Sequence, residues 1–372
     1  MIIGVLKEQG IETRVSFLPE HIAAFTKLQV KVLVENNAGN TSYAANIDYE
    51  NAGASIDSRN NILQQATIIL SINELSADDI ANCKGKILLG FYQPLFNAIQ
   101  INNLAKSDFT IFSIDMIPRT TRAQSMDVLS SQANIAGYKA VLLAANLYPK
   151  YFPMFMTAAG SIPPAKMLIL GAGVAGLQAI ATAKRLGAVV EVFDTRPQVK
   201  EEVMSLGAKF VEVEGAADAA KAGGYAVEQT EEFMQRQKAR IAESVAKSDI
   251  IITTAAIQGR KAPILITDDM LATMKKGSVI IDLAASTGGN TTVTKNEETV
   301  VVNGVNVIGA SNLSSTMPSD ASKLYGKNIS NFLQLIITKE GELNLNFEDD
   351  LVKGTCVAHG GVVVNERVKA AI

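Results

Sequence analysis

The chain has 372 residues, a length that predicts two domains, because single hydrophobic cores rarely grow past about 250–300 residues. The formal net charge of −3 at pH 7 is close to balance, which argues against a nucleic-acid-binding protein. With only two cysteines and two histidines, neither a disulfide framework nor a metal site is expected, whereas a reduced cytoplasmic setting is.

The first residues lack the layout of a signal peptide, and no charge-free apolar run is long enough to cross a bilayer. We therefore expect a soluble chain, which can still dock on a membrane partner. In the first 118 residues, short apolar runs alternate with helical patterns, which predicts a mostly parallel sheet without a glycine fingerprint. The predicted strands lie at 2–6, 31–35, 67–71, 86–91 and 110–113, and the predicted helices at 19–28 and 48–53.

A polar segment follows Pro118 and leads into a long helix. Residues 119–130 are dense in hydrogen-bonding groups, and from Asp127 the pattern predicts a helix that ends near Tyr148 and connects two lobes. Gln124, Asp127 and Ser130 are spaced three apart and share one helical face. With Arg119 they form the most suggestive polar set of the chain. Asp127 is also a good helix cap, so a purely structural role stays open.

Residues 166–194 hold the most informative motif. An apolar run at 167–170 predicts a buried strand, and residues 177–186 predict a helix. Between them stand Gly171, Gly173 and Gly176 in G-x-G-x-x-G spacing. The first glycine permits a sharp turn, the second lets the backbone approach a pyrophosphate, and the third lets helix pack on strand. The helix N-terminus then offers N–H groups to phosphates, so we expect a dinucleotide site here.

An acidic residue supports this interpretation. A second strand at 189–193 leads directly to Asp194, whose carboxylate can accept hydrogen bonds from the adenosine ribose hydroxyls. Its charge would repel a 2′-phosphate at the same place. The motif therefore favours NAD(H) over NADP(H).

The remaining pattern completes a second α/β lobe. Residues 215–228 are small and rich in glycine and alanine, which suggests a mobile surface loop or lid. We expect one lobe at 1–130 plus 330–372 and a nucleotide-binding lobe at 131–329. Further strands are predicted at 209–213, 249–254, 278–282 and 305–308, and further helices at 198–206, 229–247, 268–274 and 318–338.

Small residues and histidines complete the set of candidates. Thr253, Thr254 and Ala255 end a predicted strand, where small side chains either leave room for a nicotinamide ribose or simply pack under the next helix. His21 is expected at the surface, and His359, which two glycines follow, is expected in a structural turn. With so few histidines, acid–base catalysis by imidazole has little to draw on. Hydride transfer between two nicotinamides needs none.

Several of these stretches together resemble the alanine dehydrogenase / pyridine nucleotide transhydrogenase family, over essentially the whole chain. They are KEQGIETRVSFLP, RTTRAQSMD, LILGAGVAGLQAIATAKRLGAVVEVFDTRP, GGYA and VIIDLAASTGGN. Within that family the chain is most similar to the NAD(H)-binding α1 subunits of proton-translocating transhydrogenases. The resemblance implies two Rossmann-like lobes with mostly parallel sheets, joined by long helices with a cleft between them, in a homodimer.

The resemblance also implies roles for individual residues. The polar set at Arg119, Gln124, Asp127 and Ser130 would orient the nicotinamide, with Tyr225 on a loop that closes over the nucleotide. The further implied NAD(H) contacts are Thr120, Thr121, Val174, Thr195, Arg196, Gly224, Gln237 and Ala256, besides the three glycines and Asp194.

Four positions separate the branches of the family. Alanine dehydrogenases hold pyruvate with an arginine, a lysine and a histidine, and use a catalytic aspartate. Arg14 fits the arginine, but Asn73, Gln93 and Ser286 stand at the other three positions. Without a proton donor, reductive amination should be very slow.

The resemblance therefore implies hydride transfer between NAD(H) held here and NADP(H) on a partner subunit. A separate membrane-spanning subunit would couple this step to proton translocation, and the chain would lie on the cytoplasmic face of the inner membrane. An alanine dehydrogenase-like enzyme and a non-catalytic NAD(H)-sensing module remain as alternatives.

Overall fold

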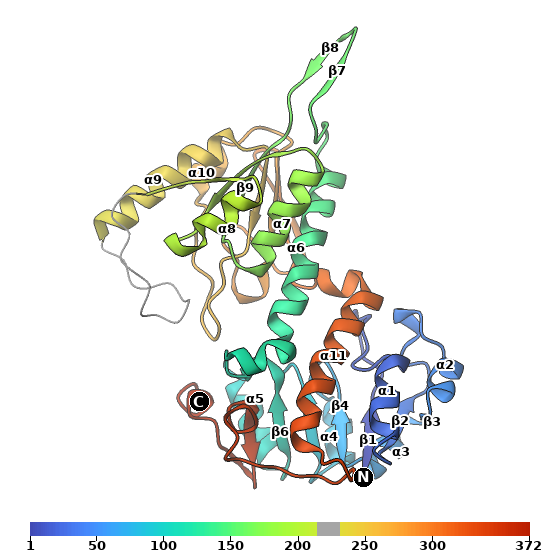
Figure 1. Ribbon diagram of the computed structural model, residues 1–372. Coiled ribbons are helices and arrows are strands. Elements are labelled where there is room, and N and C mark those ends of the chain that lie inside the picture. The colour runs from blue at the N-terminus through green and yellow to red at the C-terminus, as the bar shows by residue number, and fades with distance from the viewer. Residues whose placement is uncertain (214–230) are drawn as a thin grey trace. The chain divides into compact units, whose positions relative to one another are not determined.

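The computed structural model describes residues 1–213 and 231–372, which form two compact units (Figure 1). Unit 1 contains Met1–Gln132 and Ser314–Ile372, and unit 2 contains Ala133–Leu313. The second boundary lies earlier in the chain than the expected 329/330. The reason is helix α11 (Pro318–Ile336), whose buried Ile329, Phe332 and Leu333 belong to the hydrophobic core of unit 1.

Unit 1 is built on an eight-stranded sheet of order β17-β16-β6-β5-β4-β1-β2-β3. The six strands from β6 to β3 are parallel, and β16 and β17 add antiparallel pairings at one edge. The strands are β1 (Ile2–Val5), β2 (Lys31–Glu35), β3 (Ser55–Asp57), β4 (Ile68–Leu70), β5 (Ile87–Gly90), β6 (Thr110–Ser113), β16 (Cys356–His359) and β17 (Val362–Val363).

Both faces of this sheet are covered. Along β4, Ile68 and Leu70 belong to one hydrophobic cluster and Ile69 to another, because successive side chains of a strand point to opposite faces. Strands buried on both faces read as continuous apolar runs, as β4 and β5 do. The helices of unit 1, besides α11, are α1 (Pro19–Thr26), α2 (Asn46–Asn51), α3 (Arg59–Gln65), α4 (Ala77–Asn82), α5 (Ala98–Ala105), α12 (Asp350–Thr355) and α13 (Glu366–Lys369).

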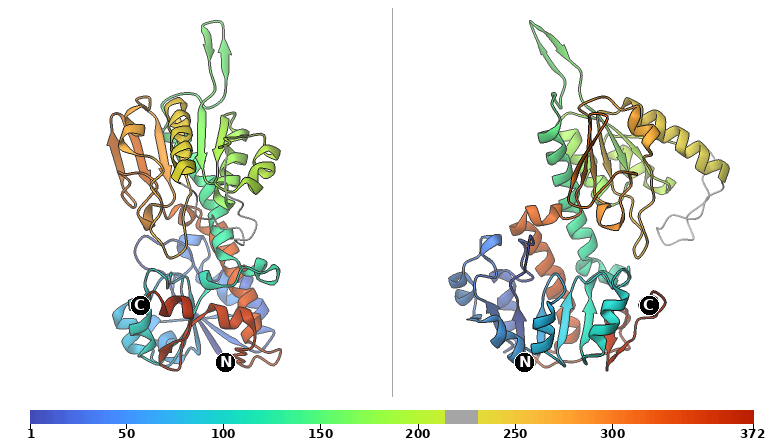
Figure 2. Two further views of the ribbon diagram at one scale, coloured as in Figure 1. Left: turned by 90° about the vertical axis from the view of Figure 1, so that its left-hand side faces the viewer. Right: turned by 180° about the vertical axis from the view of Figure 1, so that it is seen from behind.

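In the described part of unit 2, seven strands form a sheet of order β11-β10-β9-β12-β13-β15-β14, parallel except for β14. Helices lie on both of its faces (Figure 2). The strands are β9 (Lys166–Leu170), β10 (Val189–Phe193), β11 (Lys209–Phe210), β12 (Ile250–Thr253), β13 (Val279–Asp282), β14 (Thr299–Val302) and β15 (Val305–Gly309). The helices are α6 (Val128–Leu147, which begins in unit 1), α7 (Val174–Arg185), α8 (Lys200–Ser205), α9 (Glu231–Lys247) and α10 (Asp268–Ala272).

Short 3-10 helices connect the main elements. They are η1 (Asn40–Ser42), η2 (Ile114–Met116), η3 (Thr121–Met126), η4 (Pro197–Val199), η5 (Ala285–Thr287) and η6 (Leu313–Thr316). Among the described residues, no helix combines the length and the apolar character that crossing a membrane would require.

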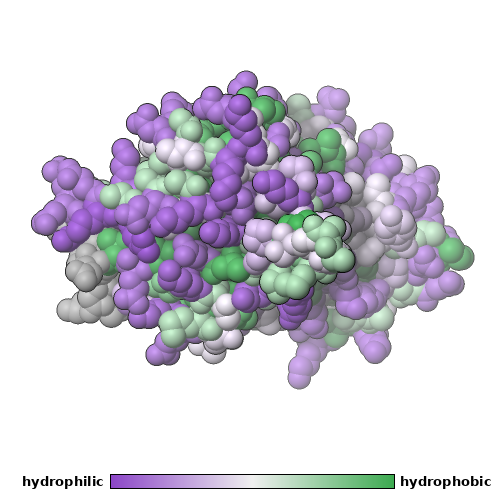
Figure 3. Space-filling view, turned by 90° about the horizontal axis from the view of Figure 1, so that it is seen from above, coloured by the Kyte–Doolittle hydropathy of each residue, from purple (hydrophilic) through white to green (hydrophobic). Residues whose placement is uncertain are grey.

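A two-stranded hairpin projects from unit 2 (Figures 1 and 2). Its strands β7 (Phe155–Thr157) and β8 (Gly160–Ile162) pair antiparallel, and every residue in them is exposed. Exposed apolar side chains gather here, with Met154 at 65% and Met156 at 70% of their full exposure. Seen from above, the surface is mostly hydrophilic with scattered hydrophobic patches (Figure 3).

The expectation that His21 lies at the surface is wrong. The imidazole of His21 is buried, and its Nε2 lies 3.1 Å from the carbonyl oxygen of Lys323 on α11. Its Nδ1 accepts a hydrogen bond from the backbone N–H of Leu18 at 3.0 Å. Gly326 makes room for the ring, because a Cβ at that position would lie 2.5 Å from Cε1 of His21. His359 stands at the end of β16, directly before the two-glycine turn to β17, as expected.

Candidate nucleotide-binding site

The three glycines of the turn after β9 meet three different constraints. Gly171 has a φ of +108°, and a Cβ there would lie 2.4 Å from the hydroxyl of Thr254. At Gly176 a Cβ would lie 1.9 Å from the carbonyl oxygen of Gly171, so this glycine lets α7 approach the strand. At Gly173 a Cβ would meet no atom within 4 Å. The open space beside the second glycine is the place that a pyrophosphate needs.

Helix α7 begins immediately at this open space. Gly173 is its N-cap residue and carries no capping side chain, so the helix starts at Val174, three residues before the expected Leu177. The first N–H groups of a helix have no partners within the helix and attract anions. Val174 is 39% exposed. The turn therefore fits the phosphates of a dinucleotide.

Asp194 is tied directly to the glycine turn. Its Oδ2 accepts a hydrogen bond from the backbone N–H of Ala172 at 2.7 Å. Arg196 surrounds the same carboxylate, because its backbone N–H and Nε donate to Oδ1 at 2.8 and 3.0 Å and its second terminal nitrogen donates to Oδ2 at 3.0 Å. Hydrogen bonding to Asp194 raises the pKa of the Arg196 guanidinium.

The carboxylate of Asp194 is only 7% exposed, and these four donors use the acceptor positions that two carboxylate oxygens offer. Ribose hydroxyls would therefore have to replace the side chain of Arg196 to reach it. The motif places Asp194 and Arg196 together in sequence but carries no sign that one occupies the other.

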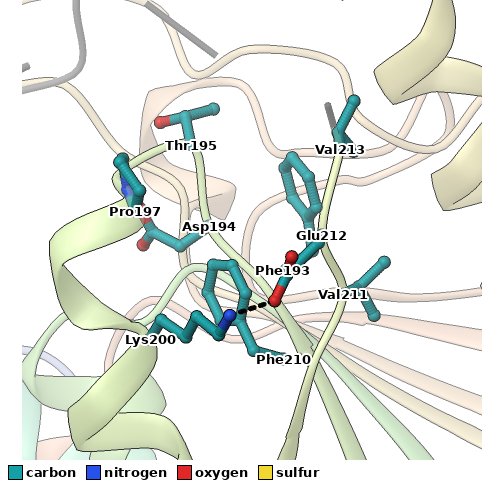
Figure 4. Close-up of a pocket in the computed structure, with 9 residues that line it drawn as sticks. All are labelled: Phe193, Asp194, Thr195, Pro197, Lys200, Phe210, Val211, Glu212 and Val213. Atoms are coloured by element: carbon teal, nitrogen blue, oxygen red, sulfur yellow. Dashed lines mark ion pairs between the residues drawn. The ribbon is translucent and has the colours of Figure 1, made fainter. Parts of the chain in front are cut away.

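A pocket of about 530 Å³ lies beside Asp194, between the ends of β10 and β11 (Figure 4). Phe193 and Phe210 give it an apolar wall, and Lys200 forms an ion pair with Glu212 at its edge. Such a pocket suits a flat ring next to a ribose. The lining residues are Phe193, Asp194, Thr195, Pro197, Lys200, Phe210, Val211, Glu212 and Val213.

The end of β12 lies beside the glycine turn. The hydroxyl of Thr254 donates to the carbonyl oxygen of Gly171 at 3.1 Å and so stabilises the turn itself. Asn290 binds the next residue on both sides, because its Oδ1 accepts from the N–H of Ala255 at 3.1 Å and its Nδ2 donates to the carbonyl of Ala255 at 2.8 Å. A further bond joins Nδ2 to the carbonyl of Pro263 at 2.8 Å. Ala256 follows and is exposed.

Asn290 is a residue that sequence reasoning missed, although it ends the stretch VIIDLAASTGGN. It is fully buried, and its backbone N–H donates to Oδ2 of Asp282 at 2.6 Å. Asp282 also accepts from the hydroxyl of Thr294 at 2.7 Å. The two strand ends of β12 and β13 are therefore joined through one carboxamide. An asparagine after two glycines was the available signal.

The polar set of unit 1 lies on η3 and at the start of α6. Asp127 accepts hydrogen bonds from the N–H and the hydroxyl of Ser130 at 2.9 and 2.6 Å, so these two residues meet as the three-residue spacing predicts. This pairing caps α6. Arg119, Thr120, Thr121 and Gln124 are exposed.

Other expected contacts stand apart from this set. Gln237 is half-buried on α9, and Gly224 and Tyr225 lie outside the described residues.

Arg14 is held by its own unit. Its guanidinium forms an ion pair with Glu12 at 2.6 Å and donates to Gln132 at 2.9 Å and to Ser314 at 3.1 Å. The ion pair lowers the pKa of Glu12 against the opposing effect of burial. These bonds join three segments of unit 1, which is a structural role.

Glu8 is a second residue that sequence reasoning missed. Its carboxylate accepts from the backbone N–H groups of Ile72 and Asn73 at 2.6 and 3.1 Å, and from the side chain of Asn73 at 3.1 Å. Burial raises the pKa of Glu8 to about 7. Gln93 follows β5 closely in sequence and has a φ of +47°, and Ser286 lies in η5 of unit 2.

The sheet of unit 2, with a glycine turn where β10 and β12 diverge from β9, belongs to the Rossmann class of nucleotide-binding domains. Family comparison agrees and goes further. The "Alanine dehydrogenase/PNT, N-terminal domain" family matches residues 4–136, and the "Alanine dehydrogenase/PNT, C-terminal domain" family matches residues 140–366. The chain therefore belongs to the alanine dehydrogenase/PNT family, a family of pyridine-nucleotide-binding proteins.

Individual relatives separate the two branches. The chain is 43% identical to the first portion of the NAD(P) transhydrogenase alpha subunit of Rhodospirillum rubrum, over 98% of each chain. A solved structure, "transhydrogenase from Sinorhizobium meliloti", is also 43% identical, with a TM-score of 0.89 over 98% of this chain and 100% of that one. "Alanine dehydrogenase 2" of Staphylococcus aureus is 28% identical over 86% of this chain and 82% of its own length.

Proposed function

We propose that the chain is the NAD(H)-binding subunit of a proton-translocating NAD(P) transhydrogenase. In this proposal NADH bound here supplies a hydride that passes directly to NADP⁺ held on a partner subunit. The observation that carries it is the glycine turn joined to Asp194 through the Ala172 amide, in a chain 43% identical over its length to a transhydrogenase alpha subunit.

The assignment of NAD(H) rather than NADP(H) rests on Asp194. This carboxylate is nearly buried and lies beside the turn that fits the pyrophosphate. A 2′-phosphate would bring a second negative charge to the same place. Thr195 borders the adjoining pocket, where we propose that the adenosine binds.

The polar set of unit 1 has the chemistry to orient a nicotinamide. Arg119 and Gln124 present exposed donors, and Asp127 and Ser130 hold the first turn of α6. Direct hydride transfer needs alignment rather than an acid or base, and alignment contributes up to about 7–11 kcal/mol in favourable intramolecular cases.

We further propose contacts to the nucleotide from Thr120, Thr121, Gln237 and Ala256. The loop with Gly224 and Tyr225 would close over the nucleotide, and it belongs to the undescribed part of the chain.

The alternative of an alanine dehydrogenase has less support. Asn73, Gln93 and Ser286 replace a lysine, a histidine and an aspartate, and Arg14 is already paired with Glu12. Glu8 has a pKa near neutrality, but its oxygens accept bonds from Ile72 and Asn73. We expect no oxidation of NADH when pyruvate and ammonium are supplied. Rapid oxidation would favour the dehydrogenase.

The proposed partners are an NADP(H)-binding subunit and a membrane-spanning subunit, which would hold the chain at the cytoplasmic face of the inner membrane. We also propose a homodimer. The exposed apolar hairpin supports it, with Phe155 stacked on Tyr151 at 4.8 Å between ring centroids. Replacing Met156 and Phe155 with Glu should halve the mass measured by light scattering, and an unchanged mass would argue against the hairpin.

The testing experiment mixes the chain with the NADP(H)-binding subunit from the same source and follows NADP⁺ reduction by NADH. Arg119→Ala and Gln124→Ala should slow hydride transfer far more than they weaken NADH binding, which is measured separately by NADH fluorescence. An unchanged transfer rate in both variants would remove the role assigned to the polar set. A sensing module would bind NADH and transfer no hydride.

A further inference from the structure

Two asparagines of α11 hold the backbone of the polar set. Asn328 and Asn331 lie one helical turn apart, and the Nδ2 of each donates a hydrogen bond of 2.9 Å to the carbonyl oxygen of Ser125. Ser125 is the residue directly after Gln124 in η3. One main-chain oxygen next to a proposed nicotinamide ligand is therefore fixed by two side chains from a distant part of the sequence.

Asn328 makes a second connection. Its Oδ1 accepts a hydrogen bond of 2.7 Å from the hydroxyl of Ser131, in the first turn of α6. The side chain is 7% exposed, so water competes little for these bonds. One carboxamide thus joins η3 to α6, on either side of Asp127.

Apolar contacts fix the same segment. Ala123 and Met126 are 2% and 6% exposed and belong to the core of unit 1. Gln124, between them, is exposed. The backbone is thus anchored by its neighbours while the functional amide stays available.

The ion pair of Arg122 with Asp349 contributes less, because the arginine is 53% exposed and exposed pairs stabilise by about 0–1 kcal/mol.

We propose that Asn328 is a positioning residue for hydride transfer, assisted by Asn331. It acts through the Ser125 carbonyl and the Ser131 hydroxyl to hold Arg119 and Gln124 in place before the nucleotide binds. The inference rests on the proposed function. Its physical basis is that a supporting residue which fixes a reacting group lowers the cost of alignment, and that a displacement of about 1 Å costs up to about 100-fold in rate.

The test compares four variants of the full chain, each mixed with the NADP(H)-binding subunit at saturating NADH. Asn328→Ala removes both connections and should slow hydride transfer on the order of 10-fold. Asn331→Ala leaves Asn328 on the same oxygen and should slow it less than about 3-fold. The double variant leaves the Ser125 carbonyl without either donor and should be slowest. Gln334→Ala, an exposed position of the same helix, is the matched control and should equal the parent.

The rate is expressed per NADH-binding site, counted by fluorescence titration, so that unfolded protein does not lower it. A positioning role predicts that the rate falls while the dissociation constant for NADH stays within about 3-fold, since binding uses other contacts. A rate loss that follows weaker NADH binding in proportion would overturn the inference, as would Asn328→Ala and the double variant both matching Gln334→Ala. A parent chain that transfers no hydride would overturn the proposed function, and the inference with it.

Discussion

The two units share one strand order and differ at one place. In unit 1 the parallel strands run β3-β2-β1-β4-β5-β6, and in unit 2 they run β11-β10-β9-β12-β13-β15. Each central strand, β1 or β9, has neighbours on both sides, and in open sheets of this kind ligands bind beyond the carboxyl end of that strand. In unit 2 this end carries the glycine turn with open space beside Gly173.

In unit 1 the corresponding place is occupied by the protein itself. The carboxylate of Glu8, three residues after β1, accepts bonds from the N–H groups of Ile72 and Asn73 after β4. A side-chain carboxylate thus satisfies backbone donors of the kind that a ligand would meet. The comparison teaches that the strand order provides a position, and that the residues after the strands decide whether a ligand can use it.

The largest effect is expected at Gly173. Gly173→Val should fold normally, because its φ of −78° suits any residue and a Cβ would meet no atom within 4 Å. It should fill the space beside the phosphates and weaken NADH binding on the order of 100-fold, or about 2.8 kcal/mol. Isothermal titration measures the affinity and a melting curve the fold. Unchanged affinity in a folded variant would mean that the turn does not hold the nucleotide.

The strand–turn–helix of unit 2 could be predicted from sequence because its signals are local. β10 was expected at 189–193 and lies there, as β2 and β6 lie at 31–35 and 110–113. Short elements such as β7 and α4 were missed, since a few residues give too little periodicity.

Contacts between distant residues were invisible for another reason. His21 is buried because Gly326, far along the chain, leaves room for its ring. Asn328 reaches Ser125 across a similar separation, and Glu8 reaches Asn73. Periodicity and motif spacing describe neighbours in sequence, and such pairings arise only when the chain folds.

The second prediction sharpens the site of unit 2 at its acidic residue. Asp194→Ala should weaken NADH binding about 10-fold and strengthen NADPH binding, because Arg196 loses its carboxylate partner and can attract a 2′-phosphate. Dissociation constants for both nucleotides give the result. Glu191→Gln, on the same strand, is a control that should change neither. Weaker binding of both nucleotides would show that Asp194 supports the turn without selecting NAD(H).

The third prediction concerns the filled position of unit 1. The folded-state pKa of Glu8, about 7, lies above its ordinary value of 4.5, so the folded chain binds more protons between these values. Its contribution to the free energy of unfolding is therefore present below pH 4.5 and lost as the pH rises to 7, by at most about 1.4 kcal/mol per pH unit.

Glu8→Gln cannot titrate and should lack this part of the pH dependence. Urea unfolding at pH 5, 6 and 7 measures the difference between parent and variant. Parallel pH profiles would contradict the burial of the carboxylate. NADH affinity at pH 7 should stay within about twofold, since this position is not offered to a ligand.

The smallest effect is expected from Arg122→Ala. Its exposed pair with Asp349 should contribute less than about 1 kcal/mol to stability, and the contribution should fall further at high salt. Chemical unfolding at low and high ionic strength measures it. A larger loss that salt does not reduce would indicate that the pair anchors the polar set as strongly as Asn328.

The central claim is direct hydride transfer from NADH on this chain, and isotope labelling tests it most directly. NADH carrying deuterium at the transferred position is mixed with the chain, its NADP(H)-binding partner and NADP⁺, and the NADPH formed is examined by mass spectrometry. The account predicts that the deuterium appears in NADPH without exchange into water. NADPH without the label, or oxidation of NADH only when pyruvate and ammonium are present, would contradict it.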